Sequence, residues 1–191
     1  INLIVIFGFI DIQYHSHGLS GWFSISFIVI FGFWDILHQY HGLSGWFSIY
    51  FIVIVIFGLP GAFTPTCSNE QLPAFEAQYE KFKELGIDDV YCISVNDGFV
   101  MRSWGISMTP KVEKVFLCPD GDGSFTEKMG MLIDKPANKF GKRSWRYSAY
   151  VDNGEIKKMF IEPGKNDKSE DEDPYEVSDP ETMLKYLQDN K

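Results

Sequence analysis

An apolar run, a loop rich in proline and glycine, and an amphipathic stretch follow one another between residues 52 and 86. The run 52–57 consists of β-branched and aromatic residues and ends at glycine and proline, which is typical of a buried strand of a parallel sheet. After the loop, apolar residues recur every three or four positions up to Leu85, and Gly86 follows as a C-cap, which predicts a helix. A strand that enters a helix through a short loop favours an α/β fold.

The following residues continue the alternation of strands and helices. Buried strands are predicted at 90–95 and 112–118, with a short helix at 97–105 between them. Two short strand patterns flank Asn153 and Gly154, which is a strong signal of a β-hairpin. This order predicts an α/β sandwich with a central mixed sheet flanked by helices, in which an antiparallel pair follows the parallel strands.

Three local features refine this prediction. Pro73 lies in the first turns of the first helix and should kink it, because proline lacks an N–H and its ring crowds the preceding turn. Ser178 is a candidate N-cap of a last helix, and Glu181 three residues later would complete a capping box. The acidic run 167–174, "DKSEDEDP", is interpreted as a solvated loop.

The beginning of the chain is an apolar tandem repeat. Residues 4–27 recur as residues 28–51, with 18 of 24 positions identical. Two copies are too few for a self-supporting solenoid. We therefore divide the chain into this repeat, residues 1–51, and an α/β domain, residues 52–191. The residues leave three interpretations of the repeat open: a disordered segment, a membrane anchor, or an artefact of the gene model.

A membrane span is conceivable at the junction, because the uncharged window 43–63 is long enough to cross a bilayer. We favour the buried strand at 52–57, because a span there would consume the loop that follows. The formal net charge is −9 and no Lys or Arg precedes Lys81, which argues against a nucleic-acid partner and against a secretory signal peptide.

The cysteines and histidines indicate neither a disulfide scaffold nor a metal site. Cys67, Cys92 and Cys118 are few, far apart and not in a CxxC pair, which favours a reduced, cytoplasmic setting. All four histidines lie in the repeat, without acidic or thiol partners in ligand spacing, so we predict no metal.

Cys67 stands at the end of the proline- and glycine-rich loop, where the first helix starts. The N–H groups and the positive dipole end of a helix N-terminus favour a thiolate, and an arginine that reaches the site would favour it further. No histidine follows residue 41, so the chain offers no histidine base for Cys67. Such a nucleophile suits a substrate that needs hydrogen-bond donors rather than a general base, for example the O–O bond of a peroxide.

Three segments together are similar to one family: "PGAFTPTCS" (60–68), "SVNDGFVMRSWG" (94–105) and "GKRSWRYSAYVDNG" (141–154). They resemble the type II, peroxiredoxin-5-like peroxiredoxins. "KKMFIEPGK" (157–165) and "PYEVSDPETMLKYL" (174–187) resemble the peroxiredoxin half of bacterial-type peroxiredoxin–glutaredoxin hybrids. The resemblance covers about residues 52–191 and implies a thioredoxin-like fold and a thiol peroxidase without a cofactor.

The resemblance also implies roles for individual residues. Cys67 would be the peroxidatic nucleophile, and Thr64 would hydrogen-bond the peroxide and the thiolate. Arg146 would polarise the peroxide and steady the thiolate. Pro60 would shield the sulfur from water. Arg143 is near Arg146 in sequence, so we rank it second, as a supporting cation at the substrate.

The implied reaction reduces hydrogen peroxide and alkyl hydroperoxides through a sulfenic acid on Cys67. No cysteine follows Cys118, and Cys92 is expected to pack in the core. The resemblance implies a sheet order in which the strand of Cys118 does not adjoin the strand before Cys67. We therefore expect a one-cysteine mechanism recycled by glutathione or glutaredoxin, with thioredoxin as the alternative reductant. The resemblance implies a homodimer. The second hypothesis is a membrane-anchored or non-catalytic redox-binding protein derived from this family.

Overall fold

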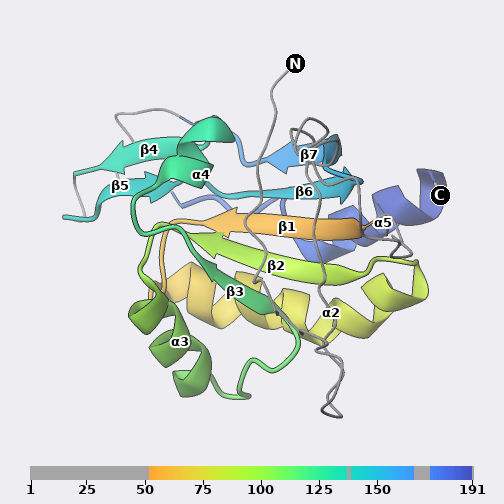
Figure 1. Cartoon of the computed structure of the whole chain (residues 1–191), viewed down its shortest axis with the longest axis horizontal. Coiled ribbons are helices and arrows are strands. Elements are labelled where there is room, and N and C mark those ends of the chain that lie inside the picture. Colours follow the sequence, from red (N-terminus) through yellow and green to blue (C-terminus); the bar gives the residue numbers. More distant parts are fainter. Residues whose placement is uncertain (1–51, 137–138, 166–172, 191) are drawn as a thin grey trace, which may run out of the picture.

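The computed structural model describes residues 52–136, 139–165 and 173–190, so the repeat at 1–51 lies outside the described residues. A five-stranded mixed sheet forms the centre of the described part, in the order β3-β2-β1-β6-β7 (Figure 1). Its strands are β1 (Val53–Leu59), β2 (Asp89–Ser94), β3 (Phe116–Pro119), β6 (Tyr147–Asp152) and β7 (Glu155–Ile161). A two-stranded sheet pairs β4 (Leu132–Lys135) with β5 (Gly141–Ser144). The helices are the π-helical turn η1 (Cys67–Gln71), α2 (Leu72–Glu84), α3 (Gly98–Ser107), α4 (Ser124–Lys128) and α5 (Pro180–Asn190).

The strand directions confirm the predicted mixed sheet. β1 runs parallel to β2, and β2 runs parallel to β3. β6 is antiparallel to β1, and β7 is antiparallel to β6. The hairpin between β6 and β7 turns at Asn153 and Gly154, whose φ angles of 51° and 79° suit a two-residue turn with positive φ at both central positions.

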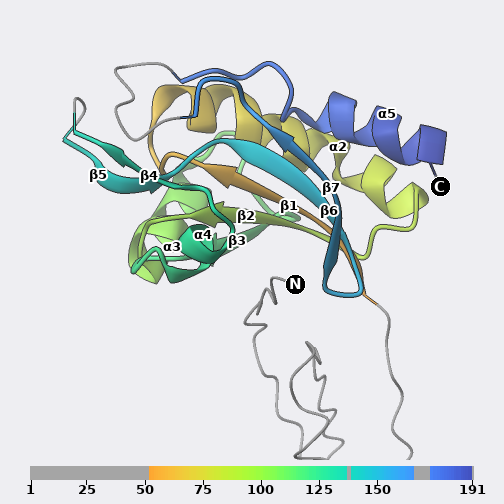
Figure 2. The same ribbon diagram turned by 90° about the horizontal axis from the view of Figure 1, so that it is seen from above.

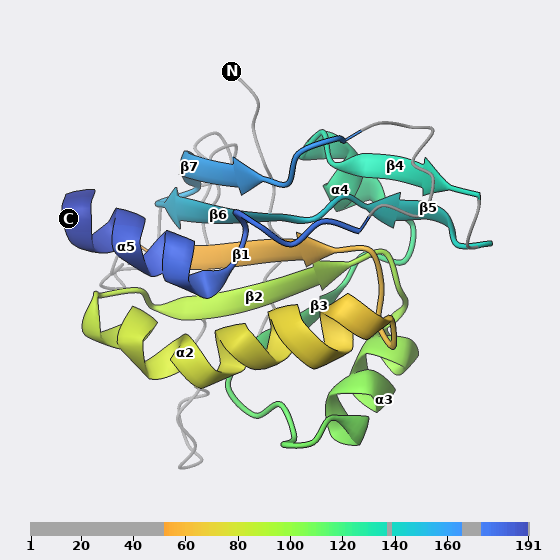
Figure 3. The same ribbon diagram turned by 180° about the vertical axis from the view of Figure 1, so that it is seen from behind.

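The central strand β1 is buried on both faces. Val55, Phe57 and Leu59 join one core cluster, and Ile54 and Ile56 join the other, because successive side chains of a strand point to opposite faces. Helices α2 and α5 lie on one side of the sheet and α4 lies on the other (Figures 2 and 3). The first cluster takes these residues from α2 and α5: Leu72, Phe75, Phe82, Met183, Leu184 and Leu187. Burial on both faces explains the uninterrupted apolar run.

Three distant parts of the sequence meet at one end of the sheet. β1 and β2 are parallel, so the loops that follow Leu59 and Ser94 leave the sheet at the same end. β6 is antiparallel to β1 and places Tyr147 opposite Gly58, which brings the residue before β6 to this end as well. Glycine is required at position 58, because a Cβ atom there would lie 2.1 Å from Tyr147 Cε1.

The predicted start of the last helix changes in the structure. α5 begins at Pro180, and the carboxylate of Asp179 caps it by accepting the N–H of Thr182 at 2.9 Å. The predicted Ser178 cap is therefore wrong, because Ser178 binds the carboxylate of Glu162 instead. Directly ahead of α2, which contains Pro73, lies the π turn Cys67–Gln71. Proline and π turns are both common causes of helix kinks, and the kink at Pro73 stays a prediction.

The third strand is shorter than predicted. It spans Phe116–Pro119 rather than 112–118, because the carboxylate of Glu76 on α2 accepts the N–H groups of Glu113, Lys114 and Val115, each at 2.9 Å. These N–H groups are therefore bound to a side chain instead of a neighbouring strand. α4 and the β4–β5 hairpin had no counterpart in the predicted order.

Residues 53–59 of the window 43–63 form β1, which confirms the strand interpretation for that part of the window. Within the three described ranges, no helix combines the length and apolar character that a membrane crossing requires.

Deletion of the repeat should leave a folded domain. β1 is paired with β2 on one side and β6 on the other, so the described sheet already supplies both of its neighbours. A chain that begins at Ile49 should melt cooperatively, within about 4 °C of the full chain. It should also be more soluble, because consecutive apolar strand-like runs invite edge pairing. The comparison is thermal melting of both chains. A truncated chain that does not fold, beside a full chain that melts cooperatively, would make the repeat part of the domain.

Candidate active site

Cys67 lies in the first helical turns after the loop that follows β1. Helical turns begin at Pro65, and the N–H of Ser68 donates to the Thr64 carbonyl at 2.9 Å. The Cys67 side chain is fully buried in the same core cluster as Phe57 and Phe75. The position predicted from the sequence, at the start of a helix, is confirmed. Residues of the helix and the sheet shield the sulfur from bulk water.

The guanidinium of Arg146 faces the Cys67 sulfur. Its Nη1 donates to Cys67 Sγ at 3.6 Å and also to Gln71 Oε1. Its Nε donates to the carbonyl of Pro174 at 3.0 Å, and its Nη2 pairs with the Asp173 carboxylate. Arg146 is only 1% exposed, so this planar group is held on several sides inside the protein.

The surroundings of Arg146 keep it positively charged. Burial lowers the pKa of Arg146, but the adjacent Cys67 sulfur and the Asp173 carboxylate raise it above its ordinary value. The ring of Tyr175 also lies 5.6 Å from the guanidinium carbon, in cation–π range. Cys67 therefore faces a permanent cation.

The loop before Cys67 is fastened to the loop that follows β2. The N–H of Ala62 donates to Asn96 Oδ1 at 3.0 Å, and the hydroxyl of Ser94 donates to the same oxygen at 2.7 Å. Pro60 is buried at the start of the loop. These contacts fix the backbone that leads to Cys67.

Thr64 occupies the same turn as Cys67, three residues earlier. Its hydroxyl donates to the Gly61 carbonyl at 2.8 Å, so in this structure its proton is directed into the loop rather than to the sulfur. The hydroxyl oxygen can still accept a hydrogen bond, for example from a peroxide O–H.

Arg143 contacts both the loop before Cys67 and the loop that follows β2, and its guanidinium binds a backbone carbonyl. Its Nη1 donates to the carbonyl of Val95 at 2.6 Å, and its guanidinium carbon lies 5.5 Å from the ring centroid of Phe140. A Cβ atom at Gly61 would lie 3.8 Å from Arg143 Nε, which places this arginine against the loop before Cys67. Partial burial lowers the pKa of Arg143.

The other two cysteines lie on β2 and β3. Cys92 on β2 is fully buried, and burial raises its pKa well above the ordinary value. Cys118 on β3 has its pKa raised to about 11 by burial. β2 separates β3 from β1, as expected, and all three cysteines are free thiols.

Several residues of the site were missed in the sequence. Gln71 binds Arg146, and its position four residues after Cys67 on a helix was the available signal. Asp173 belongs to the acidic run that was interpreted as solvated. That interpretation is wrong for Asp173, which pairs with buried Arg146, while residues 167–172 lie outside the described residues. No pattern pointed to Asn96 or Pro174.

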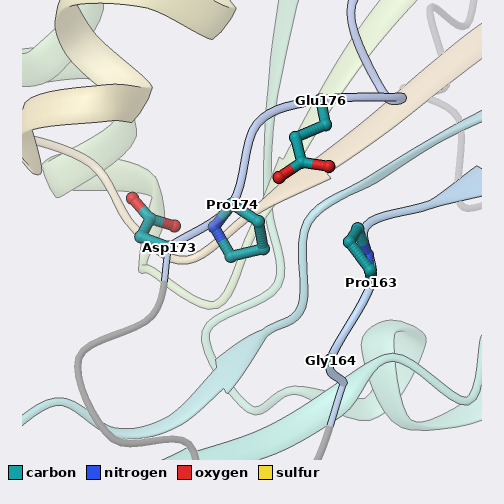
Figure 4. Close-up of a pocket in the computed structure, with 5 residues that line it drawn as sticks. All are labelled: Pro163, Gly164, Asp173, Pro174 and Glu176. Atoms are coloured by element: carbon teal, nitrogen blue, oxygen red, sulfur yellow. The ribbon is translucent and has the colours of Figure 1, made fainter.

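A separate cavity of about 490 Å³ lies beside this site (Figure 4). Its described lining residues are Pro163, Gly164, Asp173, Pro174 and Glu176. It shares Asp173 and Pro174 with the partners of Arg146. In the part of the chain that the structure covers, no cluster of three or more His, Cys, Asp or Glu side chains could hold a metal ion. The four histidines fall outside that part.

Comparison with known proteins places the chain in a family. The profile of the Redoxin family matches residues 52–177. A peroxiredoxin of Synechocystis sp. is 56% identical over 133 residues, which cover 70% of this chain and 69% of that protein. The hybrid peroxiredoxin hyPrx5 of Haemophilus influenzae is 53% identical over 133 residues, which are 70% of this chain and 52% of the hybrid.

A solved structure gives the same result. The crystal structure of the Plasmodium falciparum antioxidant protein, a 1-Cys peroxiredoxin, is 41% identical and superposes with a TM-score of 0.69. The superposition covers 73% of this chain and 77% of that one. The thioredoxin-like fold and the family resemblance are thereby confirmed, and the chain belongs to the peroxiredoxins, which are thiol peroxidases.

Proposed function

We propose that this peroxiredoxin reduces hydrogen peroxide and alkyl hydroperoxides with Cys67 as its nucleophile. The observation that carries the proposal is the contact of 3.6 Å between Arg146 Nη1 and Cys67 Sγ in a fully buried site. Arg146 thus supplies a fixed cation and a hydrogen-bond donor at this sulfur, and the thiolate is the reactive form of a cysteine. At Cys92 burial raises the pKa well above its ordinary value even though Arg146 lowers it, and burial raises the pKa of Cys118 to about 11.

The proposed step is a displacement at oxygen. The Cys67 thiolate attacks the terminal oxygen of the peroxide, an S–O bond forms and the O–O bond breaks. The leaving oxygen takes the electron pair and, with a proton, departs as water or an alcohol. Sulfur is oxidised to the sulfenic acid, and the peroxide is reduced.

Arg146 and Thr64 are proposed to position the peroxide. Donors that are fixed where negative charge develops on the leaving oxygen stabilise the transition state. Arg146 supplies such donors, and the Thr64 hydroxyl can accept a hydrogen bond from the peroxide. Pro60, buried beside the loop, is proposed to limit the access of water to the sulfur. Arg143 is proposed to support the site indirectly, by holding the loops together.

We propose one-cysteine recycling by glutathione or glutaredoxin. A glutathione thiol would condense with the sulfenic acid and release water, and a second thiol would free Cys67 by exchange at the mixed disulfide. The 1-Cys name of the Plasmodium falciparum relative and the hybrid name of the Haemophilus influenzae relative support this proposal. So does the sheet order, because β2 lies between the strand of Cys118 and β1.

Removal of Cys118 should leave most of the activity. Burial disfavours the charged thiolate and raises the pKa of Cys118 to about 11, so its thiolate fraction grows only as the pH approaches that value. Cys118→Ser should therefore keep most of the turnover at pH 7, and the ratio of variant to unchanged protein should stay constant up to pH 9. The measurement is peroxide consumption at both pH values, with Cys92→Ala as a parallel variant. A loss in Cys118→Ser as deep as that in a Cys67 variant would contradict one-cysteine recycling.

The reductant is tested by a paired assay. Peroxide consumption should be sustained by glutathione with glutaredoxin and should be much slower with thioredoxin and its reductase. Faster turnover with thioredoxin would refute the proposed recycling and leave the first step intact.

A further inference from the structure

A buried carboxylate lies behind Arg146. Glu162 follows β7 and is 1% exposed. Its N–H donates to the Arg146 carbonyl at 3.1 Å, and its own carbonyl accepts Trp145 Nε1 at 2.8 Å. The backbone of Glu162 is thus attached to the short segment that carries Arg146.

The carboxylate of Glu162 points to a different part of the chain. Its Oε1 accepts the N–H groups of Val177 at 3.0 Å and Ser178 at 2.8 Å, and the Ser178 hydroxyl at 2.7 Å. Its Oε2 accepts the N–H of Glu176 at 2.9 Å. Four donors compensate the burial of this charge. Residues 173–177 form no helix or strand, so these bonds supply order that secondary structure does not.

The same segment holds the guanidinium of Arg146. Pro174 contributes its carbonyl and Asp173 its carboxylate, and both precede the residues that Glu162 binds. In Figure 4, Pro174 and Glu176 lie on one loop segment, across from Pro163. Pro163 is the residue that follows Glu162. The contacts therefore run from Glu162 through residues 173–178 to Arg146 and on to Cys67.

We propose that Glu162 is a positioning residue for the peroxidase reaction. By fixing residues 173–178, its carboxylate keeps Pro174 and Asp173 in place to hold the Arg146 guanidinium on the Cys67 sulfur. This inference rests on the role proposed above for Arg146. Donors that are fixed before the reaction avoid the reorganisation that a mobile arginine would need.

The test is Glu162→Gln in the full chain. The amide keeps the shape but replaces one acceptor oxygen by an NH2 group that faces backbone donors. The second-order rate of Cys67 oxidation by hydrogen peroxide should fall on the order of tenfold, by analogy with outer groups that orient reactive ligands. The ultraviolet absorbance of the Cys67 thiolate at neutral pH, measured against Cys67→Ser, should fall as well.

The chain offers a matched control in Glu76. Its partly buried carboxylate also accepts three backbone N–H groups, but these belong to residues 113–115 before β3. Glu76→Gln should lower thermal stability and leave the oxidation rate and the thiolate absorbance unchanged. Equal rate losses in Glu76→Gln and Glu162→Gln would mean that the loss comes from general destabilisation of the fold, and this would overturn the proposal.

A double variant separates positioning from other effects. If Glu162 acts through Arg146, Glu162→Gln should cost little rate in an Arg146→Ala background, because coupled residues are not additive. A full tenfold loss in that background would overturn the proposal. An Arg146→Ala variant with unchanged rate would instead refute the role of Arg146.

If Glu162→Gln does not fold, Ser178→Ala takes its place as the test. This variant removes one of the four donors to Glu162 and should give a smaller rate loss, and an unchanged rate would overturn the proposal.

Discussion

Replacement of Cys67 by serine should abolish peroxide reduction. Serine is nearly isosteric with cysteine, but its hydroxyl is not ionised beside Arg146 at neutral pH and is a weak nucleophile without a base. No histidine follows residue 41 to act as that base. The variant should keep the fold, because the side chain is small and its neighbours are unchanged. The measurement is turnover of hydrogen peroxide, accompanied by thermal melting.

The other two cysteines provide the controls. Cys92→Ala and Cys118→Ser should each remain active, although Cys92→Ala leaves a small cavity in the core and should melt at a lower temperature. If Cys67→Ser retained turnover, and this turnover was lost on further replacement of Cys92 or Cys118, Cys67 would not be the nucleophile.

Replacement of Arg146 by alanine should give the second largest loss. The variant removes the donor that lies 3.6 Å from the Cys67 sulfur, and it leaves Asp173 and Gln71 without their cation. By analogy with the loss of one oxyanion donor, the rate of Cys67 oxidation should fall on the order of 100-fold. Stopped-flow measurement of the reaction with hydrogen peroxide gives this rate directly.

Two further arginine variants sharpen this result. Arg146→Lys keeps the charge but cannot reproduce the planar fork that reaches Cys67, Pro174 and Asp173, so it should recover only part of the rate. Arg102→Ala removes an exposed arginine from α3 and should leave the rate unchanged. A normal rate in Arg146→Ala would exclude this residue from the reaction.

The fold was predictable where local patterns dominate. The apolar run of β1 and the Asn153-Gly154 turn correspond to a buried central strand and to the β6–β7 hairpin. Prediction failed where a carboxylate binds distant backbone groups. The Glu76 carboxylate binds backbone N–H groups that the predicted third strand would have used. The Glu162 carboxylate accepts the N–H of Ser178, the residue that was expected to cap the last helix. Hydrogen bonds of this kind join residues that are far apart in sequence, so the spacing of apolar residues along the chain does not indicate them.

The site was also predictable only where the signal is local in sequence. Cys67 is marked by its own loop and helix start, whereas Arg146, 79 residues away, was found only through family resemblance. Their contact depends on the antiparallel register that sets Tyr147 opposite Gly58, and a sequence pattern does not specify that register. Asp173 looked like one more charge in a solvated acidic run, although it pairs with a buried guanidinium.

The role of Cys67 is tested most directly by locating the sulfenic acid after a single turnover. The reduced full chain is mixed with one equivalent of hydrogen peroxide without a reductant, trapped with a sulfenic-acid reagent, and mapped by peptide mass spectrometry. We expect the adduct on Cys67, with Cys92 and Cys118 remaining as thiols. An adduct on Cys92 or Cys118 while Cys67 stays reduced would contradict the role of Cys67.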